Sequence, residues 1–233
     1  AAASGARIET GRTVREIRRT AAGFRVVCGP VPDPTVYDAD AVIVAAPAPK
    51  AAGMLRELVP AAAGELARIE YASTGLITLA YRTLRLPEGS GFLVPPTEGR
   101  LIKAVTFSSQ KWPHLGGAIV RASVGRYGEA RALQRDDGEL AAAVEAELAP
   151  LIGASEPPMD VRVTRWGGAL PQYQIGHLDR VRRIRTAVEG IPGLAVCGAA
   201  YDGVGVPACI RTGRQAAARI EAHLRRGGES SHG

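Results

Sequence analysis

The chain has 233 residues, of which 46% are hydrophobic and 5% aromatic, and its formal net charge of +6 comes mainly from arginine. This length allows one large or two small domains, no apolar run approaches the roughly 20 residues that cross a bilayer, and the sparse aromatics give no support to nucleic-acid binding. Three widely spaced cysteines and four scattered histidines exclude a disulfide framework and a metal site, and they favour a reducing compartment.

The N-terminal part combines short strands with helices. Strands are predicted at Thr13 to Ile17 and at Phe24 to Cys28, on either side of a turn. The continuous apolar run from Val42 to Ala46 predicts a strand that is buried on both faces. Helices are predicted from Pro49 to Leu58 and from Pro60 to Ile69. This order of elements is typical of an α/β domain.

The middle of the chain changes toward strand-forming residues from Thr74 onward. The expected strands, mostly antiparallel, are Thr74–Tyr81, Gly91–Pro95, Leu101–Ser108, Ala118–Val124 and Val161–Trp166. A helix is predicted from Asp136 to Leu148, because Asp136 or Asp137 can cap it and leucine and valine recur at helical spacing on one face. An antiparallel sheet with a helix is therefore expected here.

The C-terminal part returns to the α/β pattern. A helix is predicted from Leu178 to Val188, and Leu194 to Cys197 predicts a short buried strand. A second helix is predicted from Val206 to Leu224, with Pro207 in the first turn, where a missing N–H is tolerated. The α/β pattern at both ends of the chain and the antiparallel pattern in its middle together predict a mixed α/β (α+β) fold. In this fold the strands at Val42 to Ala46 and Leu194 to Cys197 share one sheet or domain.

The glycine-rich crossing before the last helix is the most informative segment. Residues Gly203 to Ala208 fit the G-x-G-x-x-A pattern, but Tyr201 and Asp202 separate them from the strand, so an ADP-binding turn is excluded. A strand, bare glycine backbone and a helix N-terminus still form a surface of unpaired N–H groups. Such a surface can hold a phosphate, a carboxylate or the electron-rich edge of a redox ring. The alternative is an ordinary corner, in which the glycines serve only the turn.

Several motifs occur in an order that resembles one enzyme family. They are Tyr71–Tyr81, Gly91–Pro95, Phe107–Trp112, Arg165–Tyr173 with Gly176-His177, and Gly198–Ile210. Together they resemble protoporphyrinogen/coproporphyrinogen oxidase, which belongs to the FAD-dependent amine-oxidase superfamily. The chain starts without Met and has no strand-led GxGxxG at its N-terminus, so we expect the C-terminal portion of such an enzyme.

The resemblance implies a fold and a set of cofactor contacts. Part of a FAD-binding Rossmann-like domain is expected at residues 1–72 and 166–224, an interleaved antiparallel-sheet substrate domain at 73–165, and a disordered tail at 225–233. The residues matched to FAD contacts are Val14 at the adenine end, Trp166 beside the flavin, and Gly198, Val204, Gly205 and Val206 along the glycine-rich segment on the isoalloxazine ring. An ordinary strand valine and a core tryptophan are the alternatives for Val14 and Trp166. No catalytic residue or metal ligand is assigned, and Asp202 is expected to be a turn or cap residue.

The resemblance also implies an activity. FAD would oxidise a porphyrinogen to the porphyrin in heme biosynthesis, with dioxygen as acceptor and coproporphyrinogen III preferred over protoporphyrinogen IX. Arginines should meet the substrate propionates, and the candidates are Arg121, Arg126, Arg165, Arg180, Arg182, Arg183 and Arg185. We expect a cytoplasmic protein, with peripheral membrane contact and the oligomeric state left open. The alternatives are another FAD-dependent amine oxidase or desaturase, and a truncated domain without catalytic activity.

Overall fold

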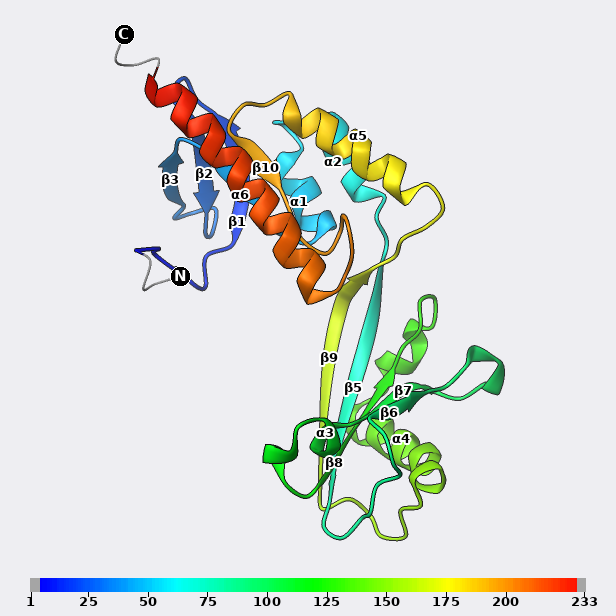
Figure 1. The fold of residues 1–233 in the computed structure, drawn as a ribbon. Helices are drawn as coiled ribbons and strands as arrows, with labels where there is room; N and C mark the ends of the chain where they lie inside the picture. Colours follow the sequence, from blue (N-terminus) through cyan, green and yellow to red (C-terminus); the bar gives the residue numbers. More distant parts are fainter. Residues whose placement is uncertain (1–4, 230–233) are drawn as a thin grey trace. The chain divides into compact units, whose positions relative to one another are not determined.

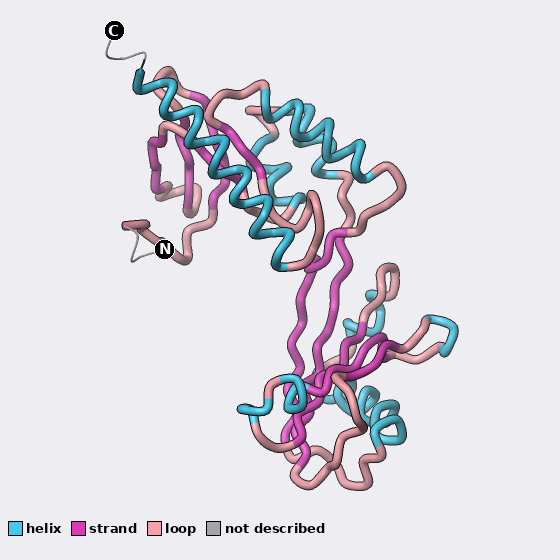
Figure 2. The backbone as a smooth tube through the Cα atoms, in the orientation of Figure 1, coloured by secondary structure: helices cyan, strands magenta, loops and turns pink. Residues whose placement is uncertain are grey.

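The structure is a computed structural model that describes residues 5–229. Its residues divide into two compact units, the first formed by Ala1–Glu70 with Pro171–Gly233 and the second by Tyr71–Leu170 (Figure 1). Both units mix helices and strands (Figure 2), so the expected α/β class is confirmed. The assignment of a FAD-binding role to one unit and a substrate-binding role to the other stays a prediction.

A parallel strand pair joins the two ends of the chain in the first unit. β4 (Val42–Val44) pairs with β10 (Leu194–Val196), and Leu194 stands opposite Val42. The predicted sharing of one sheet by these distant segments is confirmed. Burial on both faces is a wrong prediction for β4, because Ile43 remains 38% exposed. Strands of a parallel sheet are fully buried only when both faces are covered, and this two-stranded sheet leaves one side of β4 open.

Helices and a second small sheet complete the first unit. The helices are α1 (Ala48–Leu55), α2 (Pro60–Ala67), α5 (His177–Glu189) and α6 (Val206–Glu229). The strands β1 (Val14–Arg19), β2 (Phe24–Cys28) and β3 (Thr35–Ala39) form an antiparallel sheet in the order β1-β2-β3. Gly23 has to be glycine in the turn between β1 and β2, because a Cβ there would lie 2.3 Å from the carbonyl oxygen of Ala39.

The end of α6 differs from the sequence-based expectation. The helix was predicted to end at Leu224 before a disordered tail, but it continues to Glu229. An ion pair between Glu221 and Arg225, one turn apart, contributes to this extension. The rest of the predicted tail, residues 230–233, lies outside the described residues.

The second unit contains a five-stranded sheet in the order β6-β7-β8-β5-β9. Its strands are β5 (Tyr71–Tyr81), β6 (Gly91–Leu93), β7 (Ile102–Phe107), β8 (Ala118–Val124) and β9 (Asp160–Pro171). The short helical segments are η2 (Pro96–Glu98), α3 (Ser108–Lys111), η3 (Pro113–Leu115) and η4 (Ala130–Gln134). The long helix α4 (Asp137–Ile152) packs its buried residues against the sheet, and Asp136 caps it by accepting the N–H of Glu139 at 2.8 Å. The capped helix was predicted.

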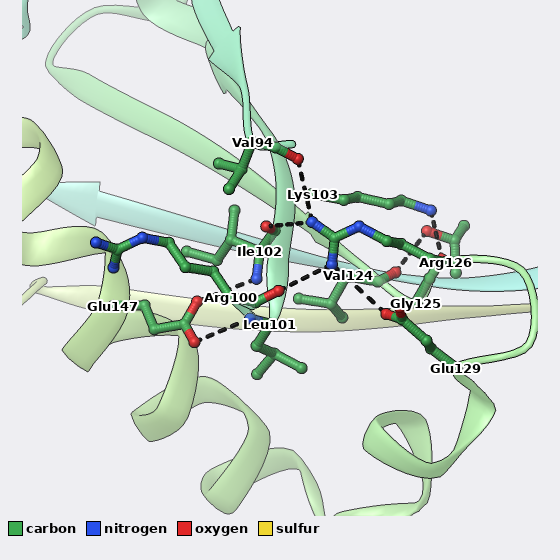
Figure 3. Close-up of polar contacts among 11 residues, drawn as sticks. Val94, Arg100, Leu101, Ile102, Lys103, Val124, Gly125, Arg126, Glu129 and Glu147 are labelled. Atoms are coloured by element: carbon green, nitrogen blue, oxygen red, sulfur yellow. Dashed lines mark hydrogen bonds and ion pairs between the residues drawn. The ribbon is translucent and has the colours of Figure 1, made fainter. Parts of the chain in front are cut away.

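A polar cluster fastens the ends of β6, β7 and β8 (Figure 3). The Arg126 guanidinium donates to the carbonyl oxygens of Arg100 at 2.8 Å and of Val94 and Ile102, each at 3.1 Å. Lys103 Nζ donates to the carbonyl oxygen of Gly125 at 2.6 Å. Burial, and then the charge of the neighbouring Arg126, lowers the pKa of Lys103. Both cationic side chains therefore donate hydrogen bonds to backbone carbonyl oxygens of this unit.

Glu147 of α4 completes the polar cluster from the helix side. Its carboxylate accepts the N–H of Leu101 at 2.9 Å and the N–H of Ile102 at 3.1 Å. These two donors lie at the start of β7, where the bulge after Ile102 interrupts the pairing with β8. The carboxylate therefore satisfies two backbone donors at the start of this strand.

Candidate functional site

The loop between β10 and α6 follows a tight path that only glycine allows. Gly198 has φ of 120°, and its N–H donates to Thr212 Oγ1 of α6 at 3.1 Å. Gly203 has φ of 148°, and a Cβ there would lie 2.9 Å from the Cβ of Ala208. The hydroxyl of Thr212 in turn donates to the carbonyl oxygen of Cys209 at 2.9 Å. The loop thus contacts α6 at two places: Gly198 bonds to Thr212, and Gly203 lies close to Ala208.

Side chains from α5 and the segment before it hold the same loop. His177 is buried, and its Nε2 donates to the carbonyl oxygen of Tyr201 at 3.1 Å. The ring of His177 stacks on Tyr173, with centroids 4.0 Å apart, and the Tyr173 hydroxyl donates to the carbonyl oxygen of Ala199. These contacts fix the crossing at two backbone positions before the glycines that precede α6.

Asp202 lies in the same loop and is engaged in an ion pair. Arg185 of α5 donates from Nη2 to Asp202 Oδ2 at 2.6 Å. Asp202 therefore acts as an anchor for the turn, which agrees with the expectation that it is no general base. The sequence analysis quoted Tyr173, Gly176 and His177 only as parts of a motif, and it did not assign them this anchoring role.

The start of α6 presents free donors beside exposed apolar side chains. The first backbone bond of the helix runs from the Cys209 N–H to the Gly205 carbonyl at 3.0 Å, so the N–H groups of Val206 and Ala208 precede the helical ladder. The first turn contains no acidic residue. Val204 is 48% exposed and Val206 is 72% exposed. The helix dipole adds positive potential here, which favours an electron-rich group.

Gly205 lies between these valines and leaves open space. A Cβ at Gly205 would meet only Pro207 Cδ, at 3.8 Å, and its φ lies outside the left-handed region. The backbone therefore does not require glycine at this position, unlike Gly198 and Gly203. A bare backbone next to free N–H groups fits the close approach of a flat ring.

The predicted site residues fall into three places. The structure brings Gly198, Val204, Gly205 and Val206 together around the start of α6 in the first unit. Val14 begins β1 in the other sheet of that unit, opposite Cys28. Trp166 belongs to β9 in the second unit and is 54% exposed, which excludes the alternative of a core tryptophan. The contacts of Val14 and Trp166 with a cofactor stay predictions.

Most of the candidate arginines are already engaged. Arg126 serves three carbonyl oxygens, as described above, and Arg165 donates to the carbonyl oxygens of Leu133 at 3.2 Å and Arg135 at 2.7 Å and pairs with Asp137. The hypothesis that Arg126 or Arg165 meets a substrate carboxylate is therefore not supported. Both serve to hold loops, because a guanidinium satisfies several carbonyl groups at once.

The arginines of α5 also have acidic partners. Arg180 and Arg183 pair with Glu65 of α2, at 3.4 Å and 2.8 Å, and Arg182 pairs with Asp179 on the same helix. The hydrogen bond from Arg183 holds the pKa of Glu65 below its usual range. Together with the Arg185 pair, this accounts for the whole α5 cluster. Its arginines join α2, α5 and the glycine-rich loop.

Two further features, a metal site and a membrane-spanning helix, are considered for the residues that the structure describes. Within residues 5–229 no group of three or more His, Cys, Asp or Glu side chains is arranged to hold a metal ion. Of the helices that the structure describes, none is long and apolar enough to cross a membrane.

The known proteins that this chain resembles are flavin oxidoreductases and porphyrinogen oxidases. The family model for flavin containing amine oxidoreductase matches residues 1–221. Coproporphyrinogen III oxidase of Mycobacterium leprae is 38% identical over 192 residues, which is 82% of this chain and 42% of that protein. Coproporphyrinogen III oxidase of Mycobacterium tuberculosis is 40% identical and covers 80% of this chain and 41% of that protein. Protoporphyrinogen oxidase of Bos taurus is 35% identical over 78% of this chain and 40% of its own length.

A solved structure extends the comparison to the fold. It comes from Exiguobacterium sp. 255-15, is assigned as a protoporphyrinogen oxidase, and aligns with a TM-score of 0.77 at 30% identity. The alignment covers 92% of this chain and 47% of that chain. The chain thus spans less than half the length of each of these relatives.

Proposed function

Because the chain belongs to the flavin containing amine oxidoreductase family, we propose that it forms part of an FAD-dependent oxidase that converts a porphyrinogen to the porphyrin. The relatives named coproporphyrinogen III oxidase and protoporphyrinogen oxidase support this substrate class. Dioxygen is the proposed acceptor, and coproporphyrinogen III is the proposed preferred substrate. A third relative, from Bacillus subtilis, also carries the coproporphyrinogen name at 34% identity, which supports this preference.

The observation that carries the proposal is the geometry at the start of α6. Bound flavin would supply a two-electron acceptor for the substrate. Among the residues that the structure describes, the N–H groups of Val206 and Ala208 have no backbone partner at the helix start, so they would stabilise negative charge on the ring edge when it is reduced. The exposed side chains of Val204 and Val206 would exclude water from the ring.

The residues around the loop have a positioning function in this proposal. Tyr173, His177 and Arg185 hold the carbonyls of Ala199 and Tyr201 and the carboxylate of Asp202. Because these anchors are fixed before a ligand arrives, the donors of the helix start do not have to reorganise during the reaction. Electrostatic stabilisation is most effective when the donors are oriented in advance.

Substrate oxidation by the full-length protein tests this function. We expect porphyrin fluorescence to develop in air when coproporphyrinogen III or protoporphyrinogen IX is added, with a higher kcat/KM for coproporphyrinogen III and a strong decrease under argon. A panel of primary amines is the comparison substrate. Peroxide production from an amine without porphyrin formation would instead indicate another amine oxidase. A preparation that binds no flavin and oxidises no substrate would indicate a domain without catalytic activity.

A further inference from the structure

One arginine on the second unit's sheet is left without a structural partner. Arg121 lies in the middle of β8, the third strand of five. Its neighbours Val120 and Ala122 are buried on the face that α4 covers, so Arg121 points to the opposite face, where it is exposed. Among the residues that the structure describes, no acceptor bonds or pairs with its guanidinium. The other arginines predicted to meet the substrate all have such partners.

Two hydroxyl groups flank Arg121 on adjacent strands. Thr78 of β5 and Thr106 of β7 each stand directly opposite Arg121 in the strand register. Residues directly opposite in an antiparallel pair have Cβ atoms about 5 Å apart. Within residues 5–229 neither threonine hydroxyl has a hydrogen-bond partner, and both side chains are half-buried. The three side chains form a row across three strands, with Arg121 at the centre and the two threonines about 10 Å apart on either side of it.

Positive charge at the centre of this face is not compensated. The five strands contain one acidic residue, Asp160, at the first position of β9. The alternation of β9 places Asp160 on the same face as Arg162, two residues further along the strand, so Arg162 has an acidic neighbour on its own strand. No acidic residue occurs on β5, β7 or β8, the strands that surround Arg121. Arg121 is therefore the better candidate for an anionic ligand.

An exposed aromatic ring lies on the same face. Val161 and Val163 of β9 pack against the core, and Arg165 pairs with Asp137 at the start of α4. Since side chains alternate along a strand, Trp166 points to the opposite face, the one that carries Arg121. It is 54% exposed. The face therefore offers a flat apolar surface in addition to a cationic centre.

We propose that Arg121, which stands between Thr78 and Thr106, binds a carboxylate of the substrate on this open face of the sheet. The proposal rests on the proposed function, in which the substrate is a porphyrinogen with propionate side chains. A guanidinium holds a carboxylate through two parallel N–H···O bonds, and one neighbouring threonine hydroxyl offers a neutral donor beside it. Both porphyrinogens carry propionates, so Arg121 favours coproporphyrinogen only where the carboxylate it binds is one that protoporphyrinogen lacks.

Kinetics of Arg121→Leu in the full-length protein test this assignment. Loss of a charge-assisted hydrogen bond should raise KM for coproporphyrinogen about tenfold or more, while kcat, flavin content and melting temperature stay close to wild type. Arg121→Lys should recover part of the loss, since it keeps the charge but not the bidentate geometry. The matched control is Arg162→Leu on the same face, for which KM should stay within about twofold of wild type.

Binding of coproporphyrin III, followed by quenching of protein fluorescence, gives a second readout that needs no turnover. Weaker binding to Arg121→Leu than to wild type and to Arg162→Leu supports the assignment. An unchanged KM and unchanged binding overturn it, while turnover by the wild type would leave the proposed function intact. A wild type that binds coproporphyrin III through Arg121 but oxidises no porphyrinogen overturns the proposed function alone. A wild type that binds no coproporphyrin III overturns the assignment.

Discussion

Replacement of Gly205 by valine is expected to remove most of the flavin from the full-length protein, with little change in its melting temperature. The backbone at Gly205 has no left-handed φ, and an added Cβ would meet only Pro207 Cδ at 3.8 Å. The polypeptide itself therefore tolerates a side chain. The proposed flavin would not, because the side chain would fill the space beside the N–H groups at the start of α6. Steric intrusion of this kind costs about 1–3 kcal/mol, which corresponds to a loss of affinity of about 5-fold to 150-fold.

Flavin absorbance and melting temperature, measured on the same purified variant, decide this prediction. Gly203→Ala is the matched control two residues away, because its φ of 148° and its 2.9 Å approach to Ala208 Cβ make glycine necessary for the backbone. We expect the control to lower the melting temperature. If Gly205→Val instead lowers the melting temperature and retains full flavin, Gly205 serves only the turn and does not belong to the site.

Arg126→Leu is expected to lower the free energy of unfolding of the second unit by about 3 kcal/mol. The Arg126 side chain is only 14% exposed, and its guanidinium donates to the carbonyl oxygens of Val94, Arg100 and Ile102. Leucine leaves these acceptors without a donor in a partly buried site, and each such loss carries a desolvation cost. It also removes the link between β8 and the ends of β6 and β7.

Urea unfolding, combined with amide hydrogen exchange in β7 and β8, measures this loss. Arg121→Leu, on β8 five residues before Arg126, is the control, and its exposed, unpaired side chain predicts a change within about 0.5 kcal/mol. Arg126→Lys should restore only a part of the lost free energy of unfolding, because an ammonium lacks the forked donor geometry. Equal stabilities of Arg126→Leu and Arg121→Leu would show that the cluster in Figure 3 contributes little to stability.

Local sequence signals predicted those parts of the fold that depend on pattern. The apolar runs at Val42 and Leu194 indicated strands that share one sheet or domain, which is confirmed, and the structure adds that they pair in parallel. The Asp136 cap is confirmed because capping depends on residues within one turn. β3 was not predicted, because Thr35–Ala39 includes an aspartate and follows a segment rich in proline, and its pairing with β2 is what makes it a strand. Tertiary pairing outweighed local propensity there.

In the candidate site, too, local features could be predicted from the sequence and tertiary contacts could not. Glycine spacing and Pro207 predicted the crossing and the start of α6 from neighbouring residues alone. The anchors could not be predicted in this way, since His177 reaches Tyr201 and Tyr173 reaches Ala199 across a helix and a strand. The arginines were the hardest to interpret. Whether a guanidinium meets a carbonyl, as Arg126 does, or open solvent, as Arg121 does, depends on where distant backbone groups lie.

An anaerobic single-turnover measurement tests the central claim, that a flavin at the start of α6 oxidises a porphyrinogen. The flavin-loaded full-length protein is mixed with coproporphyrinogen III under argon, and its visible absorbance is followed before and after air is admitted. We predict rapid loss of the oxidised flavin spectrum, with its return in air together with porphyrin fluorescence. Flavin that stays oxidised in the presence of coproporphyrinogen III and of protoporphyrinogen IX would contradict the account.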